Sequence, residues 1–246
     1  MSSELERLYE LHDEIDKKAQ RWNRVLPVGD FRGVAAGGTV EVVVSADGRI
    51  SKITIHEGWR DTTSNEELGA RILEAYTDAT TAVMQDWGEA FDDDEEEDDP
   101  EPTPIPPLAD SFAEAMDRHV TEAGPELAER TFNRLAELLQ EVVDKLDEAE
   151  EIIKERLTAE YEGADGADTV CVTLQGTGAL VDVDIDPDWL VSRHAANITK
   201  RVSQALIAAR RKVSDAVPDD IMAGTPLARV YELLADPDAL IYELSH

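Results

Sequence analysis

The sequence has one cysteine, few aromatic residues and far fewer cations than anions. Cys171 is the single cysteine among 246 residues, so no intramolecular disulfide can form, which fits a reducing compartment. Aromatic residues make up 5% of the chain, so the core must be mainly aliphatic. Lysine and arginine total 23 against 55 acidic residues, and the formal net charge is -32. This charge favours solubility and opposes the approach of polyanions at long range.

Long apolar runs are also missing. No stretch approaches the roughly 18 apolar residues of a transmembrane helix. The first residues, MSSELERLYELHDEID, lack the apolar centre of a signal peptide. We therefore expect a cytoplasmic protein with no membrane partner.

Motifs that carry chemistry are not found either. The histidines are scattered and no pair has metal-ligand spacing; they are His12, His56, His119, His194 and His246. Asp182, Asp184 and Asp186 alternate, but the glycine and glutamate of a calcium loop are missing. Asp182 and Asp184 are expected on the solvent face of a strand, and Asp186 at the following turn. Cys171 has no nearby histidine in the sequence. We expect no enzymatic activity, no catalytic residue, no metal and no cofactor.

Two segments are expected to lie outside the packed elements. Gly33, Gly37 and Gly38 lack the spacing of a dinucleotide-binding loop and are interpreted as a hinge after a helix. The run DDDEEEDDPE at 92–101 contains nine acids in ten residues, and PEPTPIPP follows. Like charges repel and prolines stiffen the chain, which predicts an exposed linker at 91–107. This linker is either a solvated spacer or a regulatory polyanion.

The clearest pattern is an internal repeat. TVEVVVSADGRISKITIHEGW at 39–59 and TVCVTLQGTGALVDVDIDPDW at 169–189 align without a gap at an offset of 130 residues. Apolar residues alternate in both stretches, as in strands with one buried face. Asp47-Gly48 and Thr177-Gly178 provide the turns. Trp59 and Trp189 are expected to end equivalent strands and to pack in the core, with base stacking as the alternative.

The register continues into helices on both sides. After the tryptophans, the apolar spacing predicts one helical face in each copy, formed by Leu68, Ile72, Tyr76, Ala79 and Val83 and by Ile198, Val202, Leu206, Ala209 and Val213. Before the strands, apolar stripes from Leu5 to Trp22 and from Phe132 to Leu157 predict two more helices. Gly124-Pro125 is expected to separate an extra helix, 108–122, from the second of these.

These elements predict an α+β fold. It consists of two tandem helix–antiparallel strands–helix units packed as a pseudo-dimer, with strands of both in one layer, plus a C-terminal helical tail. The expected boundaries are 1–90 for the first unit, 91–107 for the linker, 108–217 for the second unit and 218–246 for the tail. A short helix at 226–235 is expected in the tail, docked on the body or available to a partner.

The repeat resembles a known family. Both copies, over roughly 3–90 and 125–217, show a helix, the alternating strands with their turn glycine and a closing helix. The run GVAAGG at 33–38, the turn Asp186-Pro187 and the alanines Ala205, Ala208 and Ala209 add to this pattern, which is similar to the YbaB/EbfC family. The resemblance implies a bacterial nucleoid-associated protein that binds DNA without catalysis and forms homodimers. Here the second copy would replace the second subunit, giving a monomer, with a homodimer as the alternative.

One basic patch is the candidate DNA-binding site. It contains no acid and comprises Arg193, Lys200, Arg201, Arg210, Arg211 and Lys212. Given the net charge of -32, the binding is expected to be weak and non-specific. The alternative is an acidic protein-interaction module, such as an accessory protein of an actinobacterial specialised secretion system, with protein partners in place of DNA.

The acidic run and the basic patch generate a testable prediction. If the run screens the patch, deleting residues 92–99 will strengthen DNA binding, most clearly at low salt, where the Debye length is about 10 Å or more. A binding titration at two salt concentrations measures the effect. An unchanged affinity at low salt would show that the run is only a spacer.

Overall fold

The computed structural model describes residues 28–94, 118, 121, 125–234 and 237–245. They belong to two compact units, Met1–Glu101 with Arg156–Pro218, and Pro102–Glu155 with Asp219–His246. The expected N-terminal helix, the linker from residue 95 onward and nearly all of the expected helix 108–122 lie outside the described residues.

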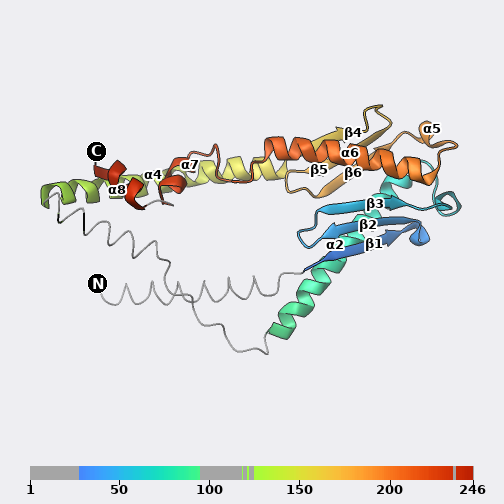
Figure 1. Cartoon of the computed structure of the whole chain (residues 1–246), viewed down its shortest axis with the longest axis horizontal. Coiled ribbons are helices and arrows are strands. Elements are labelled where there is room, and N and C mark those ends of the chain that lie inside the picture. Colours follow the sequence, from blue (N-terminus) through green and yellow to red (C-terminus); the bar gives the residue numbers. More distant parts are fainter. Residues whose placement is uncertain (1–27, 95–117, 119–120, 122–124, 235–236, 246) are drawn as a thin grey trace. The chain divides into compact units, whose positions relative to one another are not determined.

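The first unit contains both repeats, each a three-stranded antiparallel sheet followed by a helix (Figure 1). The first repeat comprises β1 (Asp30–Ala35), η1 (Ala36–Gly38), β2 (Val40–Ser45), β3 (Ile50–Ile55), η2 (Trp59–Asp61) and α2 (Leu68–Asp94). The second comprises the end of α4 (Pro125–Thr158), then β4 (Glu160–Ala164), β5 (Val170–Gln175), β6 (Leu180–Ile185), α5 (Pro187–Leu190) and α6 (Ala195–Ala216). The predicted α+β fold with two repeated units is confirmed.

The predicted register holds at the level of single residues. All alternate apolar positions of the two hairpins are buried, and so are the stripes of α2 and α6, with Val213 partly buried. The turn glycines have positive φ, 77° at Gly48 and 87° at Gly178. Both hairpins also shift register at the same place, after Val43 and after Thr173. The offset of 130 residues therefore describes the backbone as well as the sequence.

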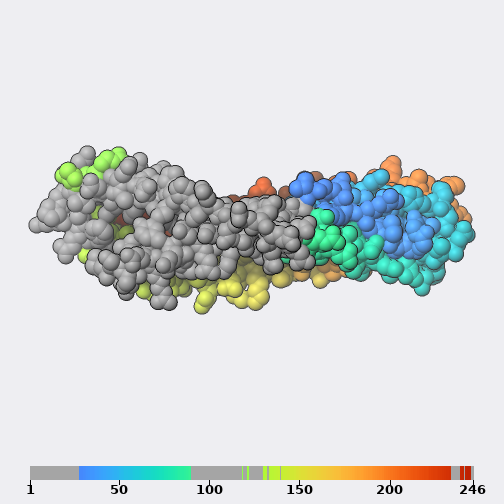
Figure 2. Space-filling view, turned by 90° about the horizontal axis from the view of Figure 1, so that it is seen from below, coloured from blue at the N-terminus to red at the C-terminus, as the bar shows by residue number. Residues whose placement is uncertain are grey.

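The two repeats share one hydrophobic core. α2 packs on β1 and β2 of its own sheet and on β6 of the other, while α6 packs on β4, β5 and β3. The Ile55 amide on β3 donates a hydrogen bond of 2.9 Å to the Thr199 hydroxyl on α6. In Figure 2 the blue-to-green surface of residues 28–89 adjoins the orange surface of the second repeat. The predicted pseudo-dimer is therefore present.

The strands do not join into one hydrogen-bonded layer. Among the described residues, β1-β2-β3 and β4-β5-β6 form separate sheets. The reason is that each helix crosses to the last strand of the other repeat, where Thr199 takes the outward amide that another strand would pair with.

The interpretation of Gly33 as hinge material is wrong. Gly33 lies within β1, and a Cβ there would be 2.1 Å from the Ala75 carbonyl oxygen and 2.2 Å from the Ala79 nitrogen. Its repeat equivalent, Gly163 on β4, faces Ala205 and Ala209 in the same way. Both glycines let a strand touch a helix backbone. Gly37 and Gly38 do sit in a turn, η1, with φ of 64° and 88°.

Two other elements differ from expectation at their ends. α2 continues to Asp94, so the first residues of the segment interpreted as linker are helical. Trp59 and Trp189 lie in η2 and α5, just beyond the strands they were expected to end.

The second unit consists of most of α4 and the tail. α4 begins at Pro125, where the break was predicted. The expected tail helix is α7 (Ala228–Leu234), and a further helix, α8 (Pro237–Ser245), follows. Leu227, Val230, Leu240 and Leu244 are buried, and Arg134 on α4 donates to the Glu243 carbonyl at 3.3 Å. The tail therefore docks within its unit.

The glycine contacts generate a stability prediction. Gly163→Ala places a Cβ 2.0 Å from the Ala209 nitrogen, so α6 must move away from β4. We expect a loss of about 3 kcal/mol in unfolding free energy, measured by chemical denaturation. Gly88→Ala is the control, because Gly88 lies in α2 with open space around it and should gain up to about 1 kcal/mol. Equal stability of the two variants would contradict the close approach.

Candidate nucleic-acid interface

The basic residues follow the outer face of α6. Its inner face, from Ile198 to Ala209, is in the core, so the opposite face meets solvent. Lys200, Gln204, Ile207 and Arg211 are spaced by four, three and four residues and share that face. Lys200, Arg211 and Lys212 are exposed, and Ile207 lies among them with 64% of its surface exposed.

At the start of α6, three of the six candidates meet in a pocket. Arg193, Lys200 and Arg201 line a cavity of about 390 Å³. The remaining lining residues are Asp165, Trp189, Asn197 and Gln204. The structure therefore brings half of the sequence-predicted patch into one concave site.

Asp165 holds Arg201 at the pocket wall. Its carboxylate accepts hydrogen bonds from the Thr169 hydroxyl at 2.6 Å, from the Thr169 and Ala167 amides and from Arg201 at 3.1 Å. Its side chain is fully buried, and burial opposes ionisation, but the hydrogen bonds outweigh this and hold the pKa of Asp165 below its ordinary value of 3.8. Asp165 is thus a structural anion that orients one cation.

Arg193 is positioned with help from the first repeat. Its guanidinium lies 5.5 Å from the Trp189 ring centre, and its Nε donates to the Trp189 carbonyl. Arg60 donates to the carbonyl oxygens of Arg193, at 2.9 Å, and Leu190. Arg60 also stacks over Trp59, which is 1% exposed and cannot meet a base. Core packing is therefore confirmed for Trp59, and Trp189, which is half-buried, packs against the same core and also lines the pocket.

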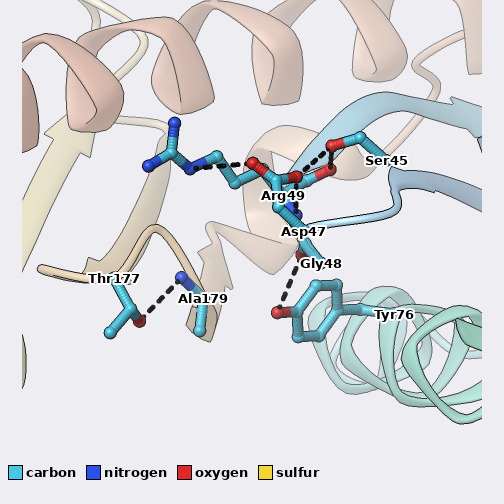
Figure 3. Close-up of polar contacts among 7 residues, drawn as sticks. All are labelled: Ser45, Asp47, Gly48, Arg49, Tyr76, Thr177 and Ala179. Atoms are coloured by element: carbon cyan, nitrogen blue, oxygen red, sulfur yellow. Dashed lines mark hydrogen bonds and ion pairs between the residues drawn. The ribbon is translucent and has the colours of Figure 1, made fainter. Parts of the chain in front are cut away.

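Arg210 lies apart from the outer face. Burial, and then the positive charge of Arg49 from the other repeat, lower the pKa of Arg210. Arg49 leaves the β2–β3 turn and extends towards the β5–β6 turn (Figure 3). Asp47 fixes this turn by accepting from Ser45 and from the Arg49 amide. Arg49 would be 3.3 Å from a Cβ at Gly178.

Arg49 and Arg60 were missed from the sequence. Their repeat equivalents are Ala179 and Leu190, so each is a cation at a position where the other repeat has an apolar residue. That departure is the signal by which they could have been found.

The chain matches a known protein family over most of its length. The model of the YbaB/EbfC DNA-binding family matches residues 2–93 and again residues 113–225. The chain belongs to the YbaB/EbfC DNA-binding family. Searches of curated proteins and of solved structures found no significant match. The family binds DNA at the nucleoid and is not enzymatic, and two copies of its unit are present in this chain.

The two YbaB/EbfC units differ in surface charge. The positions equivalent to the six candidates hold Thr63, Ala70, Arg71, Thr80, Thr81 and Ala82. Asn197 and Gln204 of the pocket are replaced by Glu67 and Glu74, and Arg71 is paired with Glu74 at 2.8 Å. Of these two sets of equivalent positions, only the one in the second repeat forms a basic face.

Elsewhere in this YbaB/EbfC chain, the residues considered for chemistry have structural surroundings. Burial, and then Glu162 and Asp184, raise the pKa of the Cys171 thiol, so it stays protonated. Asp186 caps α5 by accepting from the Asp188 and Trp189 amides. Within the described ranges, no group of three or more acidic, histidine or cysteine side chains could hold a metal, and no helix is long and apolar enough to cross a membrane.

The buried carboxylate gives a pH-dependent prediction. Asp165 has a folded-state pKa below 3.8, so its stabilisation is present above that pH and is lost as the pH falls through the folded value. Asp165→Asn should cost about 2 kcal/mol at neutral pH, and the difference from wild type should shrink below about pH 4. Chemical denaturation across pH measures both. Asp168→Asn removes an exposed carboxylate from the same loop and should show neither effect.

Proposed function

We propose that this protein binds DNA weakly and without sequence preference through the outer face of α6, the closing helix of its second repeat. One observation carries the proposal: Lys200 and Arg211 are exposed on the outer face of this helix, Lys212 is exposed next to Arg211 in the sequence, and none of the three forms an ion pair among the described residues. Arg193 and Arg201 extend this face at the pocket. Family membership supplies the class of partner.

The dimensions of the face suit a phosphate backbone. Lys200 and Arg211 are eleven residues apart, which corresponds to about 17 Å along the helix or about five base-pair steps. Lysine and arginine on a convex helical face make phosphate contacts, which position a protein on DNA but do not read its sequence. This favours binding without sequence preference.

The net charge of -32 sets the strength of binding rather than its place. At physiological ionic strength, charges more than about 8 Å from a phosphate are largely screened. The cations of α6 therefore dominate close contact, while the acidic remainder lowers the affinity. We further propose that the chain acts in the cytoplasm as a monomer, since the core that two subunits would share is already formed between its two repeats.

Charge neutralisation tests this proposal. The variant Lys200→Gln, Arg211→Gln, Lys212→Gln should weaken binding to a labelled duplex. It should also flatten the log–log salt dependence by about 0.9 for each DNA phosphate that is no longer neutralised. Fluorescence anisotropy over a salt series measures both quantities.

The matched control removes three cations elsewhere, the exposed Lys52 and Lys154 and the partly exposed Lys145, with Lys52→Gln, Lys145→Gln and Lys154→Gln. It changes the net charge equally, so a general electrostatic effect would weaken both variants alike. Equal losses of affinity, or no binding by the wild type at low salt, would refute the proposed face.

A further inference from the structure

We propose that the pocket at the start of α6 is a phosphate-binding site and that the chain has one such site rather than two. The proposal rests on the proposed function, because it names the chemistry of one part of the same face. The ligand is a phosphate group carried by a nucleotide, either within DNA or free.

The charges in the pocket favour an anion. Arg193, Lys200 and Arg201 face one carboxylate, Asp165, which leaves two positive charges uncompensated. Asp165 does not repel a ligand strongly, since it is fully buried and its oxygens already accept hydrogen bonds from the adjacent loop and from Arg201. Its effect is to hold Arg201 in place, which reduces the entropy lost when an anion binds.

Unpaired donors line the same cavity. The side chains of Lys200, Asn197 and Gln204 make no hydrogen bond or ion pair with any residue that the structure describes. Asn197, Arg201 and Gln204 occupy successive turns of α6, and Arg193 closes the pocket from the preceding loop. A phosphate oxygen accepts hydrogen bonds from both ammonium and amide donors, so one anion can use several of these groups at once.

The size of the pocket indicates what carries the phosphate. At about 390 Å³ it lies within the range of small-molecule sites and exceeds a single phosphate. The additional space is lined mainly by polar groups that could bind the hydroxyls of a sugar, and Trp189, beside Arg193, adds a small apolar part of the wall. A nucleotide fits this combination better than an inorganic ion alone.

The first repeat provides an internal comparison. At the positions of Asn197, Lys200 and Gln204 it carries Glu67, Ala70 and Glu74. Two carboxylates in place of two amides would repel a phosphate. Lys200 has no equivalent cation there, and Arg71, the equivalent of Arg201, is paired with Glu74. The same backbone therefore supports a phosphate site in the second repeat and excludes it in the first.

The test replaces two pocket residues by their equivalents from the first repeat. Asn197→Glu with Gln204→Glu changes two exposed side chains, so folding should be retained, and a melting curve checks this. The probe is pyrophosphate, and its binding is measured by isothermal titration calorimetry. We expect the wild type to bind it at one site, and the variant to bind at least tenfold more weakly. The control, Ser214→Glu with Ala216→Glu, adds the same charge at the far end of α6 and should bind pyrophosphate like the wild type.

Anisotropy with a duplex and calorimetry with ADP then identify the source of the phosphate. If the pocket variant loses affinity for DNA, the ligand is the DNA backbone. If it loses ADP but keeps DNA, the ligand is a free nucleotide; both results support the site. A wild type that does not bind pyrophosphate, or a control variant that is weakened equally, overturns the site. DNA binding by the wild type in that case would leave the proposed function standing.

Discussion

The helix of each repeat packs against the last strand of the other repeat, and the rest of the first unit depends on this exchange. A three-stranded sheet with one helix leaves part of its apolar face uncovered. Here α6 covers β3, with Thr199 bonded to Ile55, and α2 covers β6, where Gly69 lies directly on Val183. Each repeat thus completes the core of the other. The same packing fixes the orientation of α6 and hence the direction in which its cations point.

Within this symmetric framework, the interior and the surface follow different rules. Most paired core positions stay aliphatic because close packing favours apolar side chains of similar volume, and Tyr76 opposite Leu206 and Ala35 opposite Asp165 are exceptions. Gly33 and Gly163 are identical because each strand touches a helix backbone. Surface positions have no such constraint, so Glu74 in one repeat can correspond to Gln204 in the other. Opposite surface charge therefore coexists with an equivalent backbone.

Much of the fold could be predicted from periodicity, because alternation and helical spacing record burial directly. Periodicity does not reveal the strands β1 and β4. Their sequences, DFRGVA and EYEGA, contain glycine and charged residues in place of clear alternation. Gly33 shows why: its role is set by Ala75 and Ala79, more than forty residues later, and no local pattern contains that information.

The candidate site was predictable in composition but not in geometry. The six basic residues were visible as a patch without acids, yet their division was not. Arg201 is held by Asp165, which is 36 residues away, and the charge of Arg49 from the other repeat acts on Arg210. Pairing across such distances depends on the folded arrangement. The contribution of Arg60 likewise follows from a contact between repeats.

The presence of two repeats in one chain has a consequence for the number of DNA duplexes that one molecule can bind. A symmetric pair of subunits displays every surface twice, and any substitution appears on both sides. In this chain the basic face occurs once, and its counterpart carries Glu67 and Glu74. A particle with two equivalent faces can cross-link two duplexes and compact them. Through the proposed face, a particle with one basic face would occupy a single duplex and would leave neighbouring duplexes unconnected.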